Sequence, residues 1–465
     1  MDWLKPSIRS EVDTETTVLG AMLKRHGDRI LSGPTSKRPS ARHRGKPQIS
    51  IAIAQFTPTR TTVLNEKDFA NMRPGMECVL EVLRGDANRR VVPVSEWQQA
   101  FQIAEEESIL PFFAAKLRQS GVTLPDPIQL DLLQAEQDAV RNGFWWTSEL
   151  KGILQAFADN HIPVIPLKGP MFAESIYGSI NLRASRDIDL LVRPEHLPVA
   201  KSELEKLGFA RHRGGYDDKF FRGLTGHRGC YDDKFFRGAT LVELHFDVAI
   251  PQAYNFGTAS AWTRARQKEF LGIPVWLFTP SDQLLFICLH GVRHQFERLS
   301  NVLDVALALN RLTPQIHPEE FEHGTASQLR HLIVLSRTVA MHLDPHCNPG
   351  PSIDLRSGTI AQMNKLAHRM WTNLLDRPSP KQTNLAFLRF YCGLEAMTSG
   401  GLLRCARYVC FRATILHPTD FAFAERFGIK RCVLVWILRQ FRLLALLCGV
   451  DMQKRTRPEH SRNPA

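Results

Sequence analysis

Hydrophobic residues recur at three- and four-residue spacing over most of residues 76–160, which predicts a bundle of helices. Ser95 lies where a helix N-cap is expected, and Gly121 lies where that helical segment should end. Pro125 and Pro127 indicate the start of a further helix, because proline is tolerated in the first helical turn.

The pattern changes at Ile162, where a short apolar run ends in Lys168 and Gly169. After a helix-length segment, Asp187-Ile-Asp189-Leu-Leu-Val192 predicts a second strand. Strand side chains alternate between faces, so Asp187 and Asp189 share one face with their Cα atoms about 6.5 Å apart. The intervening Ile188 and its neighbour Leu190 point to the other face, into the core.

A third strand is predicted over Ala239–Ala249, where apolar and polar positions alternate cleanly. Glu243, His245 and Asp247 share one face, and the valine, leucine and phenylalanine side chains between them share the other. The polar face therefore offers a second set of side chains for chemistry.

Between these strands, a twelve-residue stretch occurs twice with a period of fifteen residues. His212–Gly223 and His227–Gly238 differ at one position. Two copies of so short a unit do not make a solenoid. The plain interpretation is a tandem duplication that lengthens a β-hairpin or loop. The alternative is that the repeated Asp-Asp-Lys and Arg form a second ligand-binding element.

Further helices follow the strands. One is expected from about Pro194 to Gly208, and helical periodicity returns from Ser281 up to Leu447. The predicted organisation has five parts: a poorly ordered basic extension (1–75), a helical bundle (76–160), a core with the duplicated segment 212–238 (161–280), a C-terminal helical domain (281–450) and a disordered tail (451–465).

Composition is that of a globular protein, with 43% hydrophobic and 23% charged residues. The net charge of +12 is concentrated at the two ends of the chain. Residues 1–60 carry 11 basic and 5 acidic side chains, and residues 401–465 carry 12 and 4. Solvated tails are the plain interpretation of these basic ends. Weak contact with nucleic acid or an anionic membrane surface is the alternative.

Nine cysteines without a Cys-x-x-Cys pair favour reduced thiols and a cytoplasmic location. The N-terminal residues have no apolar run typical of a secretory signal. Cys432–Val450 is the strongest candidate for a membrane span, but Arg439, Gln440 and Arg442 interrupt it. Charges at the centre of a span are costly, so we expect a buried or interfacial helix and no transmembrane span.

The acidic pair carries the strongest chemical signal. Two carboxylates at this separation can bind two divalent ions about 3.5–4 Å apart, an arrangement used for in-line phosphoryl and nucleotidyl transfer. Gly169 allows close approach of the backbone to phosphate, and Lys168 would neutralise phosphate charge. Arg183 and Arg186 flank the pair and could clamp phosphate oxygens.

Several residues also have ordinary structural interpretations. His245 could be a hydrogen-bonded structural histidine. His290 and His294 have the i, i+4 spacing of zinc ligands but lack the glutamate of the metalloprotease motif, which favours packing. Trp145 and Trp146 are interpreted as core or interdomain contacts rather than as a platform for stacking bases.

Together these motifs resemble the uncharacterised nucleotidyltransferase-like group of the DNA polymerase β superfamily over about residues 90–450. The resemblance rests on Leu167-Lys-Gly, Tyr177-Gly, Leu182-Arg183, Asp187-Ile-Asp189-Leu-Leu-Val and Val242-Glu-Leu-His245, followed by a helical segment with His290, His294 and Asp304. The chain departs from many superfamily members in having Gly169-Pro170 where they have Gly-Ser.

The resemblance implies an α+β fold: a polymerase-β-like mixed sheet with helices on one side and a nucleotide–metal site on its open face, flanked by N-terminal and C-terminal helical regions. It implies Mg²⁺ or Mn²⁺ as cofactor and an NTP as substrate. Asp187, Asp189 and Glu243 would be the catalytic metal ligands. Asp247 is the second choice for the third carboxylate, and His245 is a further candidate for the site.

The expected activity is metal-dependent transfer of NMP from an NTP to an acceptor by a two-metal mechanism. The acceptor is not identified and could be RNA, a protein or a small molecule. The alternative is a catalytically inactive nucleotide-binding or regulatory protein with the same fold. Retention of three candidate carboxylates favours the enzyme.

Overall fold

The computed structural model describes residues 72–211, 232–249, 253–321, 324–353, 355–376, 384–398 and 400–414, with residues 424, 425, 428, 434, 435 and 437–441. The first copy of the duplicated stretch and the tail 451–465 lie outside these residues, as do all but the last four residues of the basic extension 1–75.

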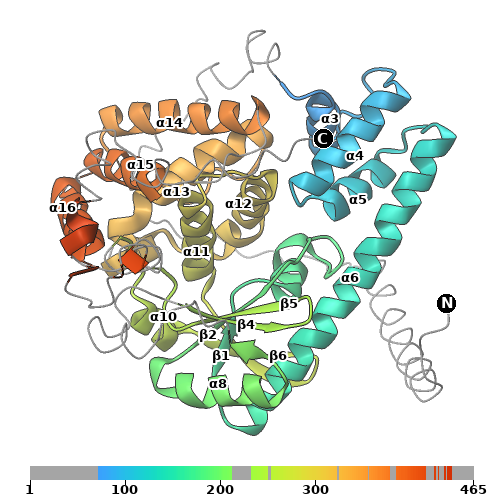
Figure 1. The fold of residues 1–465 in the computed structure, drawn as a ribbon. Coiled ribbons are helices and arrows are strands. Elements are labelled where there is room, and N and C mark those ends of the chain that lie inside the picture. Colours follow the sequence, from blue (N-terminus) through green and yellow to red (C-terminus); the bar gives the residue numbers. More distant parts are fainter. Residues whose placement is uncertain are drawn as a thin grey trace, which may run out of the picture. The chain divides into compact units, whose positions relative to one another are not determined.

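Within the described residues, four helices precede the sheet: α3 (Met76–Arg84), α4 (Val94–Glu106), α5 (Leu110–Ser120) and α6 (Asp126–Asp159) (Figure 1). Gly121 ends α5 with φ 66°, and Pro125 precedes α6, as the sequence predicted. The prediction for Ser95 was wrong: it lies inside α4, which begins after Pro93 without a side-chain cap. The backbone of Ser108, with φ 60°, separates α4 from α5.

Helix α6 connects two hydrophobic cores. At 34 residues it is about 51 Å long. Its first half contributes Ile128 and Leu132 to a core made mainly of helices. Its last turns contribute Leu150, Ile153 and Phe157 to a second core against the sheet.

The central sheet has five strands in the order β1-β2-β5-β4-β3. They are β1 (Val164–Pro166), β2 (Ile188–Val192), β3 (Ala210–Arg211), β4 (Asp232–Arg237) and β5 (Thr240–His245). Strand β2 runs parallel to β5, and the other neighbours are antiparallel. This mixed sheet among many helices confirms the α+β prediction (Figure 1).

The two faces of the sheet belong to different surroundings. Ile188 and Leu190 of β2, with Leu244 of β5, lie in the sheet core beside the end of α6 and helix α8 (Leu197–Lys206). Leu191, the next residue of β2, belongs to the helical core instead. Since side chains alternate along a strand, Asp189 lies on the face turned toward that helical core.

Between β1 and β2, the chain forms the short helix α7 (Pro170–Phe172) and a π-helical turn, η2 (Ala173–Tyr177). Before α8 a 3₁₀ turn, η3, spans Pro194–His196, and Gly208 follows α8 with φ 84°. The helix predicted over this region is confirmed.

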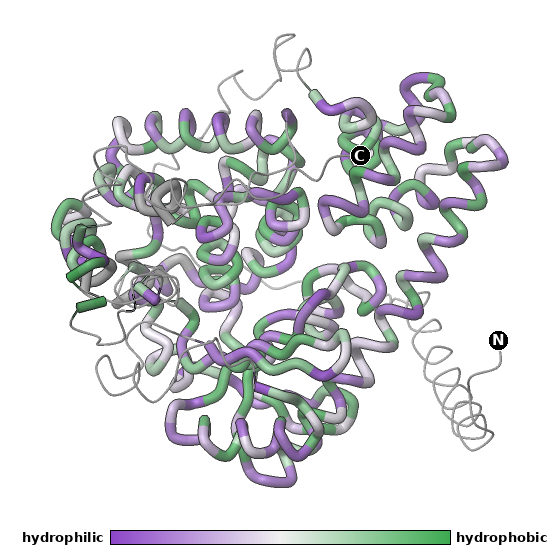
Figure 2. The backbone as a smooth tube through the Cα atoms, viewed as in Figure 1, coloured by the Kyte–Doolittle hydropathy of each residue, from purple (hydrophilic) through white to green (hydrophobic). Residues whose placement is uncertain are grey.

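The remaining elements are helix α10 (Thr258–Arg264), the hairpin β6 (Arg266–Phe270) and β7 (Ile273–Leu277), and the C-terminal helices: α11 (Pro280–Arg293), α12 (Leu299–Leu312), α13 (Gly324–Leu343), α14 (Ser357–Asp376), α15 (Asn384–Ala396) and α16 (Gly401–Thr414). Apolar and polar residues are interspersed along each of the C-terminal helices (Figure 2).

The N-terminal and C-terminal helices share one core. Buried residues from α3 to α5 and from α11 to α14 belong to the same hydrophobic cluster. Arg84 of α3 donates hydrogen bonds to the backbone oxygens of His342 and Leu343 at 2.7 and 3.0 Å. Glu107 accepts a hydrogen bond from the backbone of Leu299 at 2.9 Å.

Within the described residues, no helix is long and apolar enough to cross a membrane. Most of Cys432–Val450 lies outside those residues. The cysteines at 78, 288, 347, 392, 405 and 410 are not joined by disulfides.

Candidate active site

Two carboxylates and an imidazole meet on adjacent strands of the sheet. In the parallel pairing of β2 with β5, Asp189 lies directly opposite Glu243. His245 follows two residues later on β5, on the same face. One side-chain atom from each of these three residues lies within 4.8 Å of the other two. Among the residues described, this is the cluster whose atoms could hold a metal ion.

A lysine flanks the carboxylates on each side. The backbone N–H of Leu167 donates to the carbonyl of Asp189 at 2.9 Å, which extends the β1–β2 pairing and brings Lys168 beside that aspartate. The Lys168 Nζ lies 3.4 Å from Asp189 Oδ2. On the other side, Lys234 of β4 lies opposite Glu243 and forms an ion pair with it. We refer to Lys168, Asp189, Glu243 and Lys234 as the charged row.

Asp189 is the most tightly held member of the charged row. Its exposed fraction is 2%, and His245 Nε2 lies 2.9 Å from its Oδ1. The same imidazole nitrogen is 3.7 Å from Glu243. Burial alone would raise the pKa of Asp189, but the charge of Lys168 and the hydrogen bond from His245 outweigh it and lower that pKa. Asp189 is therefore ionised.

Asp187 immediately precedes β2 and is only partly buried. It is not a member of the three-residue cluster. Burial and the negative charge of Asp189 raise the pKa of Asp187, and Lys168 offsets part of this effect. A divalent cation would remove this repulsion, because both carboxylates would then face a positive charge.

The chain turns sharply between Lys168 and α7. Gly169 has φ 83° and ψ −154°, a conformation that disfavours any residue with a Cβ. The turn directs the chain from β1 into Pro170, the first residue of α7. Phosphate binding by Lys168 and Gly169 stays a prediction.

The two candidate arginines differ in their contacts. Arg183 donates to both carboxylate oxygens of Asp304 on α12, at 2.9 and 3.0 Å, and its guanidinium lies 5.0 Å from the ring centre of Phe172. Arg186 is exposed, but the part of its side chain that is shielded from water, together with the nearby charge of Arg298, lowers its pKa. A phosphate role for both arginines stays a prediction, and the fork of Arg183 is already engaged by a carboxylate.

Asp247 has different partners from Glu243. It lies beyond the end of β5, where its Oδ1 accepts a hydrogen bond from the backbone of Val248 at 2.7 Å and another from the hydroxyl of Thr258. Burial raises the pKa of Asp247, although these hydrogen bonds oppose the shift. Asp247 is not part of the three-residue cluster.

His290 and His294 lie on and just after α11, with ring centres 4.5 Å apart. His294 Nδ1 is 3.4 Å from a carboxylate oxygen of Glu297. Burial and the charge of Lys168 lower the pKa of His290 well below its usual value. His290 is thus neutral, and it lies close enough to the charged row for the charge of Lys168 to affect it.

Sequence reasoning considered Lys234 only as part of the repeated Asp-Asp-Lys, as a possible second ligand-binding element, and did not place it beside Glu243. This lysine belongs to the second copy of the duplicated stretch, whose residues 232–237 form β4 inside the sheet. Asp-Asp-Lys-Phe-Phe-Arg does not alternate polar and apolar residues, so it gave no clear strand signal. In the observed strand, neighbouring side chains point to opposite faces, which separates Lys234 from Phe235 in the sheet core. The first copy lies outside the described residues.

Comparison with known families gives a direct result. The family described as uncharacterised nucleotidyltransferases matches residues 93–343, which is more than half of the chain. The chain belongs to this family. It is therefore a nucleotidyltransferase, and the resemblance inferred from its motifs is confirmed. The comparison with curated proteins gives no match.

Two solved structures are similar to parts of this nucleotidyltransferase. One is ANT(2″)-Ia in complex with adenylyl-2″-tobramycin, at 16% identity over 40% of this chain and 96% of that one, with a TM-score of 0.28. The other is a solution structure of the antibiotic-resistance factor ANT(2″)-Ia, at 15% identity over 43% and 95%, with a TM-score of 0.27.

The donor set is compatible with the divalent cation that such enzymes use. Ligand atoms on opposite sides of Mg²⁺ lie about 4 Å apart, close to the 4.8 Å within which the three side chains meet. Carboxylate oxygens suit Mg²⁺ and Mn²⁺, and imidazole suits transition metals. Asp189 Oδ2 accepts no hydrogen bond although it is buried, and its nearest described cation is the Lys168 ammonium.

Proposed function

We propose that this nucleotidyltransferase moves NMP from an NTP to a hydroxyl or phosphate group of an acceptor, with Mg²⁺ or Mn²⁺ held by Asp187, Asp189 and Glu243. The observation that carries the proposal is the register of β2 and β5, which sets Asp189 beside Glu243 with His245 in the same cluster. Membership of a nucleotidyltransferase family gives this cluster its chemical context.

In the proposed reaction an acceptor oxygen forms a bond to the α-phosphorus, and an acceptor hydroxyl releases its proton to water. The bond from that phosphorus to the oxygen bridging the β-phosphate breaks, and pyrophosphate leaves with the electron pair. The bound divalent ions would lower the pKa of the attacking hydroxyl and offset negative charge on the triphosphate.

The protein's own residues would share the remaining work. Lys168 would contact the phosphates, since its Nζ already lies 3.4 Å from Asp189 at the edge of the cluster. Gly169 would let the backbone approach them closely. His245 would orient Asp189 through its 2.9 Å contact, a role often played by groups behind a metal ligand. Arg186, which is exposed, would be available to phosphate oxygens.

Incubation with each α-labelled NTP, Mg²⁺ or Mn²⁺ and a cell extract tests the proposal. A labelled product is expected with the unmodified protein and is expected to be absent with Asp189→Asn. Identification of the labelled molecule would name the acceptor. Transfer at an unchanged rate by both Asp187→Asn and Asp189→Asn would contradict the assigned metal site.

The alternative is a nucleotide-binding protein without catalysis. It predicts metal-dependent binding of an NTP, measured by calorimetry, with no labelled product from any extract. The presence of all three carboxylates favours the enzyme, because a binding protein does not need the third one to hold a triphosphate.

A further inference from the structure

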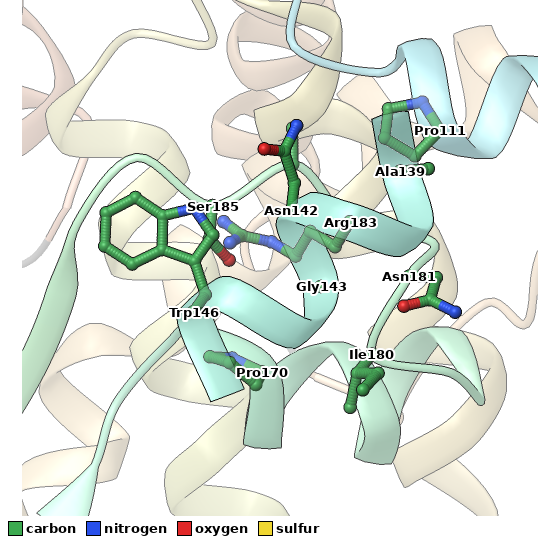
Figure 3. A pocket seen from close by; sticks show the side chains of 11 residues that line it. Pro111, Ala139, Asn142, Gly143, Trp146, Pro170, Ile180, Asn181, Arg183 and Ser185 are labelled. Atoms are coloured by element: carbon green, nitrogen blue, oxygen red, sulfur yellow. The ribbon is translucent and has the colours of Figure 1, made fainter. Parts of the chain in front are cut away.

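A small pocket, open in part to solvent, lies beside the segments of the proposed site (Figure 3). The empty space among its lining residues is about 350 Å³, which includes open solvent at its mouth. Helix α6 forms one wall through Asn142, Gly143 and Trp146. The chain from α7 to β2 forms the opposite wall.

That opposite wall is built from the two segments that carry the proposed chemistry. Pro170 lines the pocket and directly follows Gly169. Ser185 also lines it and lies two residues before Asp187. A molecule in the pocket would therefore be adjacent to both the proposed phosphate turn and the acidic strand.

The two neighbouring tryptophans of α6 have different surroundings. Trp146 lines the pocket and packs against the sheet core. Trp145 is 56% exposed and does not line it. The sequence interpretation treated this pair as one unit, and the structure separates them.

Gly143 keeps the pocket wall close to Asn181. A Cβ on Gly143 would lie 2.1 Å from Asn181 Oδ1, a distance that real contacts do not reach. Any side chain at position 143 would displace Asn181 and change the shape of the pocket. The glycine therefore permits an amide group to lie directly against α6.

The chemistry of the lining fits a planar ring with polar edges. Trp146 is one of the lining residues labelled in Figure 3, and its flat indole ring would provide a surface on which a base could stack. Asn142 and Ser185 can each donate and accept hydrogen bonds, which suits the edge of a heterocycle. Arg183 lines the same space, and its two bonds to Asp304 hold its guanidinium in place.

We propose that this pocket receives the nucleobase of the NTP, with Trp146 stacking on the ring and Asn142 and Ser185 contacting its edge. The proposal rests on the proposed function and deepens it, because it assigns the part of the substrate that the charged row does not contact. It also makes Trp146 a residue that determines nucleotide affinity, whereas Trp145 does not contribute.

The test compares equilibrium binding of each of the four NTPs with binding of inorganic tripolyphosphate. All measurements contain Mg²⁺, and none contains cell extract. Tripolyphosphate carries the phosphate chain but no base, so it reports on the charged row alone. Trp146→Ala should weaken binding of the preferred NTP by about tenfold or more, the effect expected for loss of one stacked base. Binding of tripolyphosphate should be unchanged.

Three further variants complete the design. Trp146→Phe retains an aromatic ring and should recover most of the NTP affinity. Trp145→Ala is the matched control and should bind NTP and tripolyphosphate as the unmodified protein does. Gly143→Ala removes no polar group, yet should weaken NTP binding selectively because it narrows the pocket, so it also serves if Trp146→Ala does not fold.

The proposal is overturned if Trp146→Ala and Gly143→Ala leave NTP binding unchanged, or weaken NTP and tripolyphosphate equally. If the unmodified protein binds neither NTP nor tripolyphosphate, the proposed function is overturned as well. Transfer of label by the unmodified protein with unchanged NTP affinity in the pocket variants would overturn the nucleobase site alone.

Discussion

Asp187 and Asp189 are two residues apart, but their surroundings affect ionisation in opposite directions. Lys168 and His245 stabilise the charged form of Asp189 despite its burial. Within the described part of the chain Asp187 forms no ion pair, and the charge of Asp189 adds to the cost of its burial. The isosteric variants Asp187→Asn and Asp189→Asn should therefore differ in their free energy of unfolding.

We predict that Asp189→Asn destabilises the metal-free protein and that Asp187→Asn does not. The first variant leaves Lys168 and His245 without their carboxylate and should cost about 1–3 kcal/mol. The second removes a repulsion, so its melting temperature should stay the same or rise. Thermal unfolding in excess chelator measures both, and equal destabilisation by the two variants would contradict the assigned charge pattern.

The same residues give a prediction about pH. The folded-state pKa of Asp187 is raised above 3.8, so its destabilising effect develops as pH rises from about 3.8 through the folded pKa. Asp189 has a lowered pKa, and its stabilising effect is lost as pH falls below about 3.8.

Asp187→Asn should therefore match or exceed the metal-free parent at neutral pH, and any advantage should disappear toward pH 3.8. Chemical denaturation at a series of pH values checks this. An advantage that grows as the pH falls would show that the pKa of Asp187 has the opposite shift.

At the scale of elements, the local part of the site could be predicted and the distant part could not. Strand alternation was enough to place Asp187 with Asp189 on one face and Glu243 with Asp247 on another, because period two is a local property of the chain. The choice of Glu243 over Asp247 needed the family resemblance. The bond between Arg183 and Asp304 joins residues 121 positions apart, and no local pattern contains it. The sequence therefore suggested that Arg183 binds phosphate, and it gave no indication of the ion pair between Arg183 and Asp304 of α12.

Two other features show how context overrides local preference. Ser95 has the right side chain for an N-cap, but α4 begins one residue earlier, directly after Pro93. The duplicated stretch offers two equal lysines for one strand position, Lys219 and Lys234, so the sequence alone could not assign β4.

The duplication gives a prediction about strand connection. Twenty residues separate Arg211 at the end of β3 from Asp232 at the start of β4. Deleting Gly214–Arg228 removes fifteen of them and leaves β4 and its registers intact. The remaining five-residue connection is an ordinary length for an antiparallel hairpin.

We expect the deletion variant to fold with unchanged helical circular dichroism and unchanged transfer activity. Shorter loops cost less entropy to close, about 0.6 kcal/mol for each halving of length, so stability should be equal or slightly higher. A control deletion of residues 232–246 has the same length but removes β4 and β5, and it should not fold. An insoluble Gly214–Arg228 deletion would show that the first copy is part of the core.

At the scale of the whole described structure, helix α12 holds the segment that connects the two proposed substrate contacts. Asp304 on α12 accepts hydrogen bonds from Tyr177 at 2.5 Å and from Arg183. Both partners lie in the chain between Gly169 and Asp187, and Arg183 lines the pocket. One buried carboxylate, 5% exposed, thus joins the helical region to the segment that connects the two proposed substrate contacts.

This arrangement predicts that Asp304→Asn affects substrate binding as well as stability. Removing one partner of a buried ion pair costs about 3–5 kcal/mol. Released from Asp304, Arg183 and Tyr177 would no longer fix the pocket wall, so the KM for NTP should rise several-fold while kcat changes less. Tyr177→Phe removes a single hydrogen bond and should show a smaller effect in the same direction.

Asp282 provides the matched control. It is also 5% exposed, lies in the first turn of the neighbouring helix α11 and binds Arg264 through both carboxylate oxygens at 2.7 and 3.0 Å. Neither residue lines the pocket. Asp282→Asn should therefore lower the melting temperature and leave KM unchanged. If both aspartate variants raise KM equally, the effect is a general consequence of lost stability, and Asp304 does not position the substrate segment.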